Sequence, residues 1–192
     1  MLLYIHGFNS SPLSDKGIQT AEFIQRTFPE LNFCQPQLPN CAKEAIELLS
    51  NIVQQAKAAN QPLRYIGSSL GGYFATHLAQ HYGGKAVLIN PVVKPYELME
   101  ELLGTQYNPF TEQSFEVTPE HQQWLKEIDS EVITHPDRFF VLLQTGDEVL
   151  DYRQAVNKYH CCKMLIEPNG DHGFVDYKKH LPEISNFLKL TN

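Results

Sequence analysis

The stretch Tyr65-Ile66-Gly67-Ser68-Ser69-Leu70-Gly71-Gly72 contains the pattern Gly-x-Ser-x-Gly, with Ser69 at its centre. A short β-prone run, Leu63 to Ile66, precedes it, and apolar residues at helical spacing follow it: Phe74, Ala75, Leu78, Ala79 and Tyr82. Ser69 is therefore expected at a tight turn between a strand and a helix, where a Cβ on Gly67 or Gly71 would clash. This context predicts a nucleophile elbow rather than a glycine-rich turn with an incidental serine.

Apolar runs alternate with helical periods on both sides of this turn. Further strands are predicted at residues 2–5, 31–35, 86–89, 138–143 and 162–166. The run at residues 86–89 is apolar throughout, as expected of a strand buried on both faces. Strands that alternate with helices predict an α/β fold with a mostly parallel sheet.

The helices have recognisable beginnings. Ser14, Asn40 and Asp151 are candidate N-caps, and the closing helix, Leu181 to Leu188, has Pro182 in its first turn. One face of the first helix is expected to be apolar: Ile18, Ala21, Ile24 and Phe28.

Residues 94–131 interrupt the alternation, and the segment is too long for an ordinary loop. Its weak periodicity indicates two or three short helices. It carries nine acidic and two basic residues, so its net charge of −7 equals that of the whole chain. The segment is either a solvated helical insertion or a cap over a site at the carboxyl ends of the strands. We expect one domain over residues 1–192 with this segment as a cap-like insertion.

Composition excludes several classes of protein. With 42% hydrophobic residues the chain can bury a core, and its net charge of −7 argues against a nucleic-acid partner. No apolar run is long enough to cross a membrane, and Met1 to Ile5 lacks the features of a signal peptide. The spacing of Cys34, Cys41, Cys161 and Cys162 fits neither a zinc site nor a disulfide framework. We therefore expect reduced thiols and a cytoplasmic location. We also expect no cofactor.

An elbow serine needs a base and an orienting acid, each in a loop after a strand. Asp147 follows the strand at residues 138–143, and His172 follows the strand at residues 162–166. The order Ser69, Asp147, His172 is typical of the elbow fold.

Other candidates fit these roles less well. Asp151 is better explained as a helix cap, and Asp171 is adjacent to the proposed base, so it would orient the ring poorly. His77 and His81 lie four residues apart on a helix, without a third metal ligand nearby. His6 precedes the nucleophile and is interpreted as a loop-shaping residue. The remaining histidines lie outside any strand-end site: His121, His135, His160 and His180.

The oxyanion of an acyl-transfer intermediate requires two N–H donors. We expect one from Leu70, directly after the nucleophile, and the second from Phe8 in the loop after the first strand. The alternative is that His6-Gly7 is merely a tight turn.

Four motifs together resemble the α/β-hydrolase superfamily, and more closely the small bacterial YqiA-like esterases. They are Tyr-Ile-His-Gly-Phe-Asn-Ser-Ser-Pro (residues 4–12), Gly-Ser-Ser-Leu-Gly-Gly (67–72), Thr-Gly-Asp-Glu-Val-Leu-Asp-Tyr (145–152) and Gly-Asp-His-Gly-Phe (170–174). The resemblance implies a three-layer hydrolase sandwich, acyl-ester hydrolysis, no metal, and catalytic roles for Ser69, Asp147 and His172. The resemblance departs from the general pattern at one point: we expect the two antiparallel strands that usually lead this fold to be missing.

The sequence thus predicts a serine hydrolase whose substrate is a small-molecule acyl ester or thioester, with acyl-chain length and oligomeric state undetermined. A further prediction places Tyr96, Leu98, Leu102 and Trp124, with Lys94, around an acyl pocket. An acidic cap would disfavour polyanionic leaving groups such as coenzyme A. The alternatives are a catalytically silent hydrolase-like binding protein, or a triad hydrolase of peptide or C–C bonds.

Overall fold

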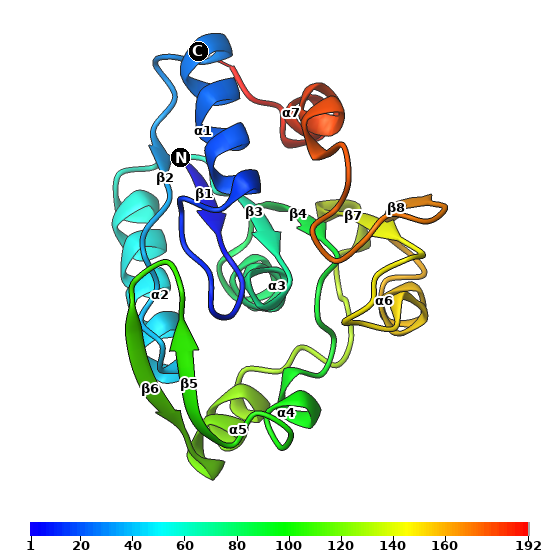
Figure 1. The fold of residues 1–192 in the computed structure, drawn as a ribbon. Coiled ribbons are helices and arrows are strands. Elements are labelled where there is room, and N and C mark those ends of the chain that lie inside the picture. Colours follow the sequence, from blue (N-terminus) through cyan, green and yellow to red (C-terminus); the bar gives the residue numbers. More distant parts are fainter. Residues whose placement is uncertain (192) are drawn as a thin grey trace.

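The computed structural model describes residues 1–191, and at its centre is a six-stranded sheet with parallel neighbours throughout (Figure 1). In spatial order the strands are β2 (Phe33–Cys34), β1 (Leu2–Ile5), β3 (Arg64–Ser68), β4 (Lys85–Ile89), β7 (Phe139–Gln144) and β8 (Lys163–Glu167). Parallel neighbours require crossover connections, most of which contain helices here. The predicted α/β class and mostly parallel sheet are confirmed.

The helices that cover the sheet are α1 (Asp15–Thr27), α2 (Ala42–Ala58), α3 (Leu70–Tyr82), α6 (Tyr152–Lys158) and α7 (Leu181–Leu188). Short 3₁₀ turns occupy Pro136–Arg138 and Tyr177–His180. Asp151 caps α6 as predicted, because its side chain accepts a hydrogen bond from the Arg153 N–H at 3.0 Å.

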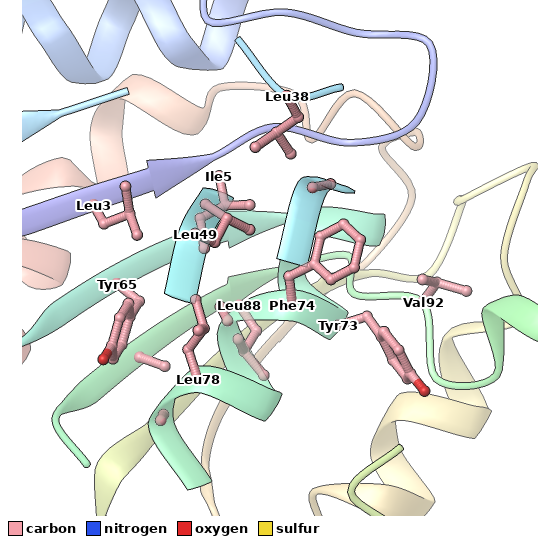
Figure 2. Packing of buried hydrophobic residues seen from close by; sticks show 14 of the residues in the cluster. Leu3, Ile5, Leu38, Leu49, Tyr65, Tyr73, Phe74, Leu78, Leu88 and Val92 are labelled. Atoms are coloured by element: carbon pink, nitrogen blue, oxygen red, sulfur yellow. The ribbon is translucent and has the colours of Figure 1, made fainter. Parts of the chain in front are cut away.

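Side chains alternate between the two faces of the sheet and build two apolar cores. In β1, Leu3 and Ile5 belong to the core shared with α2 and α3, whereas Leu2 and Tyr4 belong to the core shared with α1 and α7. Figure 2 shows the first core, in which Leu3 and Ile5 lie near Leu49 of α2. Strand β7 is buried along its whole length, as a strand covered on both faces must be. The result is a three-layer α/β/α sandwich.

The buried face of α1 differs from the prediction. Gly17, Thr20 and Ile24 are buried, whereas Ile18 is 41% exposed. Gly17 lies so close to the Pro12 carbonyl group that a Cβ there would overlap it. This close approach rotates Ile18 towards solvent.

Two boundaries also differ. Helix α2 has Cys41 at its N-cap position, one residue after the predicted Asn40. Strand β2 is limited to Phe33–Cys34, which is shorter than the predicted strand at residues 31–35.

Residues 94–131 contain two helices, as the periodicity indicates, and a hairpin, which it does not. The helices are α4 (Pro95–Leu98) and α5 (Pro119–Glu127), and the hairpin pairs β5 (Gly104–Asn108) with β6 (Gln113–Val117) in a separate antiparallel sheet. Both strands are largely polar in sequence, so they lack the alternation of apolar residues that marks a half-buried strand. Across residues 1–191, no helix combines the length and apolar character that a bilayer crossing demands.

Candidate active site

Ser69 lies in the turn between β3 and α3, and its backbone is strained as an elbow requires. Its φ and ψ of 55° and −120° fall where residues with a Cβ rarely lie. The Ser69 N–H donates to the Ile89 carbonyl at 3.0 Å, which joins the turn to β4. A Cβ on Gly67 would overlap the Gly71 carbonyl group, and one on Gly71 would overlap that of Ile5. The turn therefore has room for glycine only at both predicted positions.

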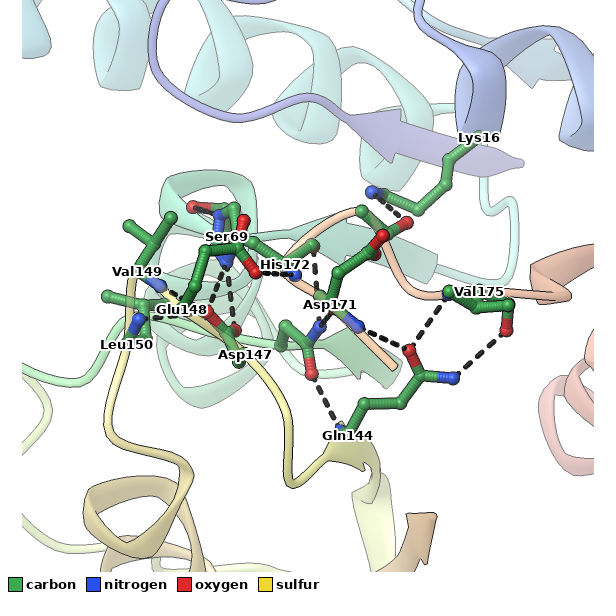
Figure 3. A network of polar contacts seen from close by, with 12 residues as sticks. Lys16, Ser69, Gln144, Asp147, Glu148, Val149, Leu150, Asp171, His172 and Val175 are labelled. Carbon is green, nitrogen blue, oxygen red and sulfur yellow. Dashed lines mark hydrogen bonds and ion pairs between the residues drawn. The ribbon is translucent and has the colours of Figure 1, made fainter. Parts of the chain in front are cut away.

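The structure brings Ser69, His172 and Asp147 into one hydrogen-bonded chain (Figure 3). His172 Nε2 lies 3.0 Å from Ser69 Oγ, and His172 Nδ1 lies 2.8 Å and 3.0 Å from the two oxygens of Asp147. Because an ionised carboxylate only accepts hydrogen bonds, Nδ1 carries the ring proton, and Nε2 is left to accept the Ser69 hydroxyl proton. This is the tautomer that a general base needs.

Asp147 is held as a carboxylate. Its side chain is only 2% exposed, and burial alone would raise its pKa. Hydrogen bonds from His172 and from the N–H groups of Leu150 and Val149, at 2.8 Å and 2.9 Å, outweigh burial, so the pKa of Asp147 is lowered. A carboxylate at this position holds the Nδ1 proton of His172 and so fixes the ring's tautomer.

Two buried amide side chains support the loop that carries His172. Gln144, at the end of β7, accepts hydrogen bonds from the N–H groups of Asp171 and Val175 at 3.2 Å and 2.8 Å. Asn90, after β4, donates to the carbonyl groups of Asp171 and His172 at 3.0 Å and 3.3 Å, and accepts from the Gln144 N–H at 3.0 Å. Both side chains are almost inaccessible to solvent, so these bonds form at a low dielectric constant.

Two charged residues also contact this loop. The Glu148 carboxylate accepts a hydrogen bond from the His172 N–H at 3.0 Å, and Lys16 of α1 donates to the Gly173 carbonyl at 2.8 Å (Figure 3). Burial lowers the pKa of Lys16, an effect that nearby carboxylates, with Asp171 first, oppose.

Asn90, Gln144, Glu148 and Lys16 are not predicted from the sequence. The signal that Asn90 and Gln144 carry is their position, each a polar residue at the carboxyl end of an apolar strand, and position alone does not assign them a role.

The loop after β1 is held by His6. Its Nε2 accepts the Leu38 N–H at 3.0 Å, so its Nδ1 carries the proton and donates to the Gly7 carbonyl at 2.9 Å. Burial lowers the pKa of His6, although its bond to Gly7 opposes this, and the neutral ring follows. His6 therefore shapes the loop in which Gly7 lies beside Ser69, with an ideal Cβ of Gly7 3.1 Å from Ser69 Cβ. Leu70 occupies the first position of α3, where its N–H lacks a partner within the helix.

Residues 94–131 directly contact the loop after β1. The ring of Phe115 packs edge-on against Phe8, with centroids 5.8 Å apart, and the Asn108 side chain donates to the Ser10 carbonyl at 3.1 Å. Figure 1 shows the hairpin alongside α2.

The residues predicted to line an acyl pocket do not lie together beside the loop after β1. The cavity next to Phe8 is lined from the insertion by Met99, Asn108, His121 and Leu125, and not by Tyr96, Leu98, Leu102 or Trp124. Tyr96 and Lys94 line a separate polar hollow together with Asp129 and Lys158. Leu98 and Leu102 pack against the core, and Trp124 packs against His121 with ring centroids 5.1 Å apart.

The two histidines that lie four residues apart on α3 pack against each other. The rings of His77 and His81 stack with centroids 5.8 Å apart, and His77 Nδ1 lies 3.0 Å from the Ile128 carbonyl. This contact joins α3 to the end of the insertion.

Comparisons with known proteins agree with this fold. The family model described as Uncharacterised protein family (UPF0227) matches residues 1–189. A UPF0227 protein from Citrobacter koseri is 26% identical over 201 residues, covering 99% of both chains. The UPF0227 protein YcfP from Escherichia coli K12 is 25% identical over 199 residues, again covering 99% of both.

Solved structures with the same fold include hydrolases. Est1E from Butyrivibrio proteoclasticus, solved with ferulic acid bound, has a TM-score of 0.67 at 14% identity, covering 98% of this chain and 87% of Est1E. Alpha/beta hydrolase domain-containing protein 10 from mouse has a TM-score of 0.66 at 14% identity, covering 98% and 89%. At these identities the likeness is one of fold.

Proposed function

This chain is a member of the UPF0227 family, and we propose that it is a serine hydrolase that cleaves carboxylic esters or thioesters. The observation that carries the proposal is the hydrogen-bonded chain from Asp147 through His172 to Ser69. The α/β-hydrolase fold supports it, since structural neighbours of this fold include esterases. The complete set of contacts counts against a silent binding protein.

In the first half-reaction, Ser69 Oγ attacks the acyl carbon while His172 Nε2 takes the hydroxyl proton. The amides of Phe8 and Leu70 donate to the oxyanion that forms, and Leu70 adds the favourable field of a helix N-terminus. The ester C–O or C–S bond then breaks, and His172 returns the proton to the leaving group.

In the second half-reaction, water attacks the acyl-enzyme. His172 takes a proton from the water and returns it to Ser69 Oγ as the carboxylic acid departs. Asp147 keeps its negative charge throughout and stabilises the imidazolium.

We further propose that residues 1–192 act as one domain and that residues 94–131 cap the site. The contacts of Phe115 and Asn108 with the loop after β1 support this role. Because exposed carboxylates cover the insertion, esters with neutral leaving groups should react faster than coenzyme A thioesters of the same acyl chain, most clearly at low salt.

Labelling with a fluorophosphonate tests the proposal. The probe should modify the protein at Ser69, and Ser69→Ala should abolish both labelling and turnover of a p-nitrophenyl ester. A folded protein that neither reacts with the probe nor hydrolyses the ester would contradict it.

A further inference from the structure

A small cavity of about 30 Å³ lies beside the elbow. Gly7 and Phe8 of the loop after β1 and Leu70 of α3 line it. A Cβ built on Gly7 would lie 3.1 Å from Ser69 Cβ and 3.6 Å from Ser69 Oγ, so this wall borders the nucleophile. Ser69 itself does not line the cavity, which reaches the nucleophile through two residues that flank it, Gly7 and Leu70.

The other walls are mostly apolar and closely packed. Phe74 and Leu38, both labelled in Figure 2, contribute from α3 and from the segment before α2. The insertion supplies Met99 and Leu125, which are 5% and 1% exposed. It also supplies His121, which burial keeps neutral by lowering its pKa, against an opposing hydrogen bond with Thr118. Such a lining favours an uncharged hydrocarbon group.

The size of the cavity limits what it accepts. An apolar protein cavity of about 150 Å³ holds one benzene molecule, which corresponds to about 25 Å³ per carbon. By that measure, 30 Å³ accepts about one carbon. A methyl group on the acyl carbon fits, whereas a longer chain meets side chains that the core already holds in place.

The larger hollow on the other side of the insertion does not suit an alkyl chain. Its volume is about 620 Å³, and Lys94, Tyr96, Asp129 and Lys158 are among its lining residues. At its wall, Lys158 pairs with Asp129 at 3.1 Å, and Asp129 accepts from the Tyr96 hydroxyl at 3.0 Å. An alkyl chain there would desolvate charged groups without pairing them.

We propose that the cavity beside Phe8 and Leu70 is the acyl pocket, that the substrates are esters of very short acids, acetyl above all, and that Met99 sets the length limit. This inference rests on the proposed serine hydrolase function. It adds to that function the length of the acyl chain that is accepted and the residue that limits this length.

The test is a series of p-nitrophenyl esters from acetate to octanoate, with kcat/KM referred to the concentration of active serine titrated by fluorophosphonate. Acetate should exceed hexanoate by about 100-fold, because a carbon that does not fit its pocket costs about tenfold or more. Met99→Ala, which removes three heavy atoms from the wall, should raise the hexanoate-to-acetate ratio at least about tenfold. Leu125→Val, a smaller change, should raise it less.

Met164→Ala is the matched control. Met164 is a partly buried methionine that packs against the same core as the buried Met99, but it lies on β8 and does not line the cavity. Its variant should keep the wild-type chain-length profile even if its stability falls. A wild-type enzyme that hydrolyses hexanoate as fast as acetate, or equal shifts in both methionine variants, would overturn the pocket assignment while leaving the triad in place. A protein that reacts with no ester and no fluorophosphonate would instead refute the hydrolase proposal itself.

Discussion

The His172 N–H donates a hydrogen bond to the Glu148 carboxylate at 3.0 Å, while the His172 ring donates to the adjacent Asp147 at 2.8 Å. Consecutive acids of one loop thus hold the histidine at its main chain and at its ring. The second contact is part of the predicted triad. The first gives Glu148 a positioning role through the main chain of His172.

Glu148→Gln and Glu148→Ala separate the contact from the charge. Glu148→Gln keeps an acceptor for the His172 N–H, so kcat should change less than about twofold. Glu148→Ala removes the acceptor, so it should lower kcat about two- to fivefold with little change in KM, because the His172 main chain loses a hydrogen bond. Steady-state kinetics with the acetate ester measures both constants. Equal kcat values for the wild type and both variants would mean that this contact does not position His172.

Asp147→Asn should lower kcat by about 10⁴, because an amide cannot hold His172 in the tautomer that accepts the serine proton. The fold should survive, since the replacement has the same shape. Steady-state kinetics with the acetate ester measures the loss. Asp151→Asn is the control: this exposed acid caps α6, asparagine caps equally well, and kcat should stay within about twofold. Near-normal activity of Asp147→Asn would assign the orienting acid elsewhere.

Gln144→Ala should both destabilise the protein and slow it. The side chain is 3% exposed and bonds the main chain of Asp171 and of Val175 as well as Glu167. Leaving these groups unpaired should cost about 2–4 kcal/mol in urea unfolding. Displacement of His172 should lower kcat with little change in KM. Gln80→Ala, which removes an exposed amide bonded to the Val132 carbonyl, should change neither property measurably. If Gln144→Ala lowers the free energy of unfolding but leaves kcat unchanged, Gln144 supports the fold without positioning His172.

Lowering the pH should reduce the free energy of unfolding, and His6 should contribute to this reduction. Burial lowers the pKa of His6 below its unfolded value of about 6.5, so the folded state resists a proton that the unfolded state accepts. Its contribution to stability is present above pH 6.5 and declines as the pH falls from there through the folded pKa. Urea unfolding at pH 7 and pH 5 should show a smaller difference for His6→Gln than for the wild type. Equal differences would exclude His6 as a source of the pH dependence.

The hydrogen-bonded chain of Ser69, His172 and Asp147 could be predicted because each of its members follows an apolar strand, and the carboxyl ends of parallel strands meet at one edge. Asn90 and Gln144 obey the same rule. They are recognised only once the structure shows their amides beneath the loop, since an amide at a strand end has no chemistry that singles it out.

The insertion could not be predicted to the same depth. The half-buried strands of its hairpin lack apolar alternation, and their positions depend on contacts with a loop remote in sequence, such as Asn108 with Ser10. The walls of the cavity beside Phe8 also depend on contacts between segments that are remote in sequence. Met99 and Leu125 meet Leu38 and Phe74 only through tertiary packing, which no local pattern encodes.

The order of strands in the sheet has a consequence for how the protein folds. Each strand of the six-stranded sheet is joined to the next one in the chain by a long crossover, and β4 separates the strand of the serine from those of the acid and the base. Such nonlocal pairings form slowly, because a large loop must close before any contact compensates for the lost entropy. During renaturation, hydrolytic competence should therefore return after helical circular dichroism does, and the recovery of turnover would report the moment when the whole sheet is assembled.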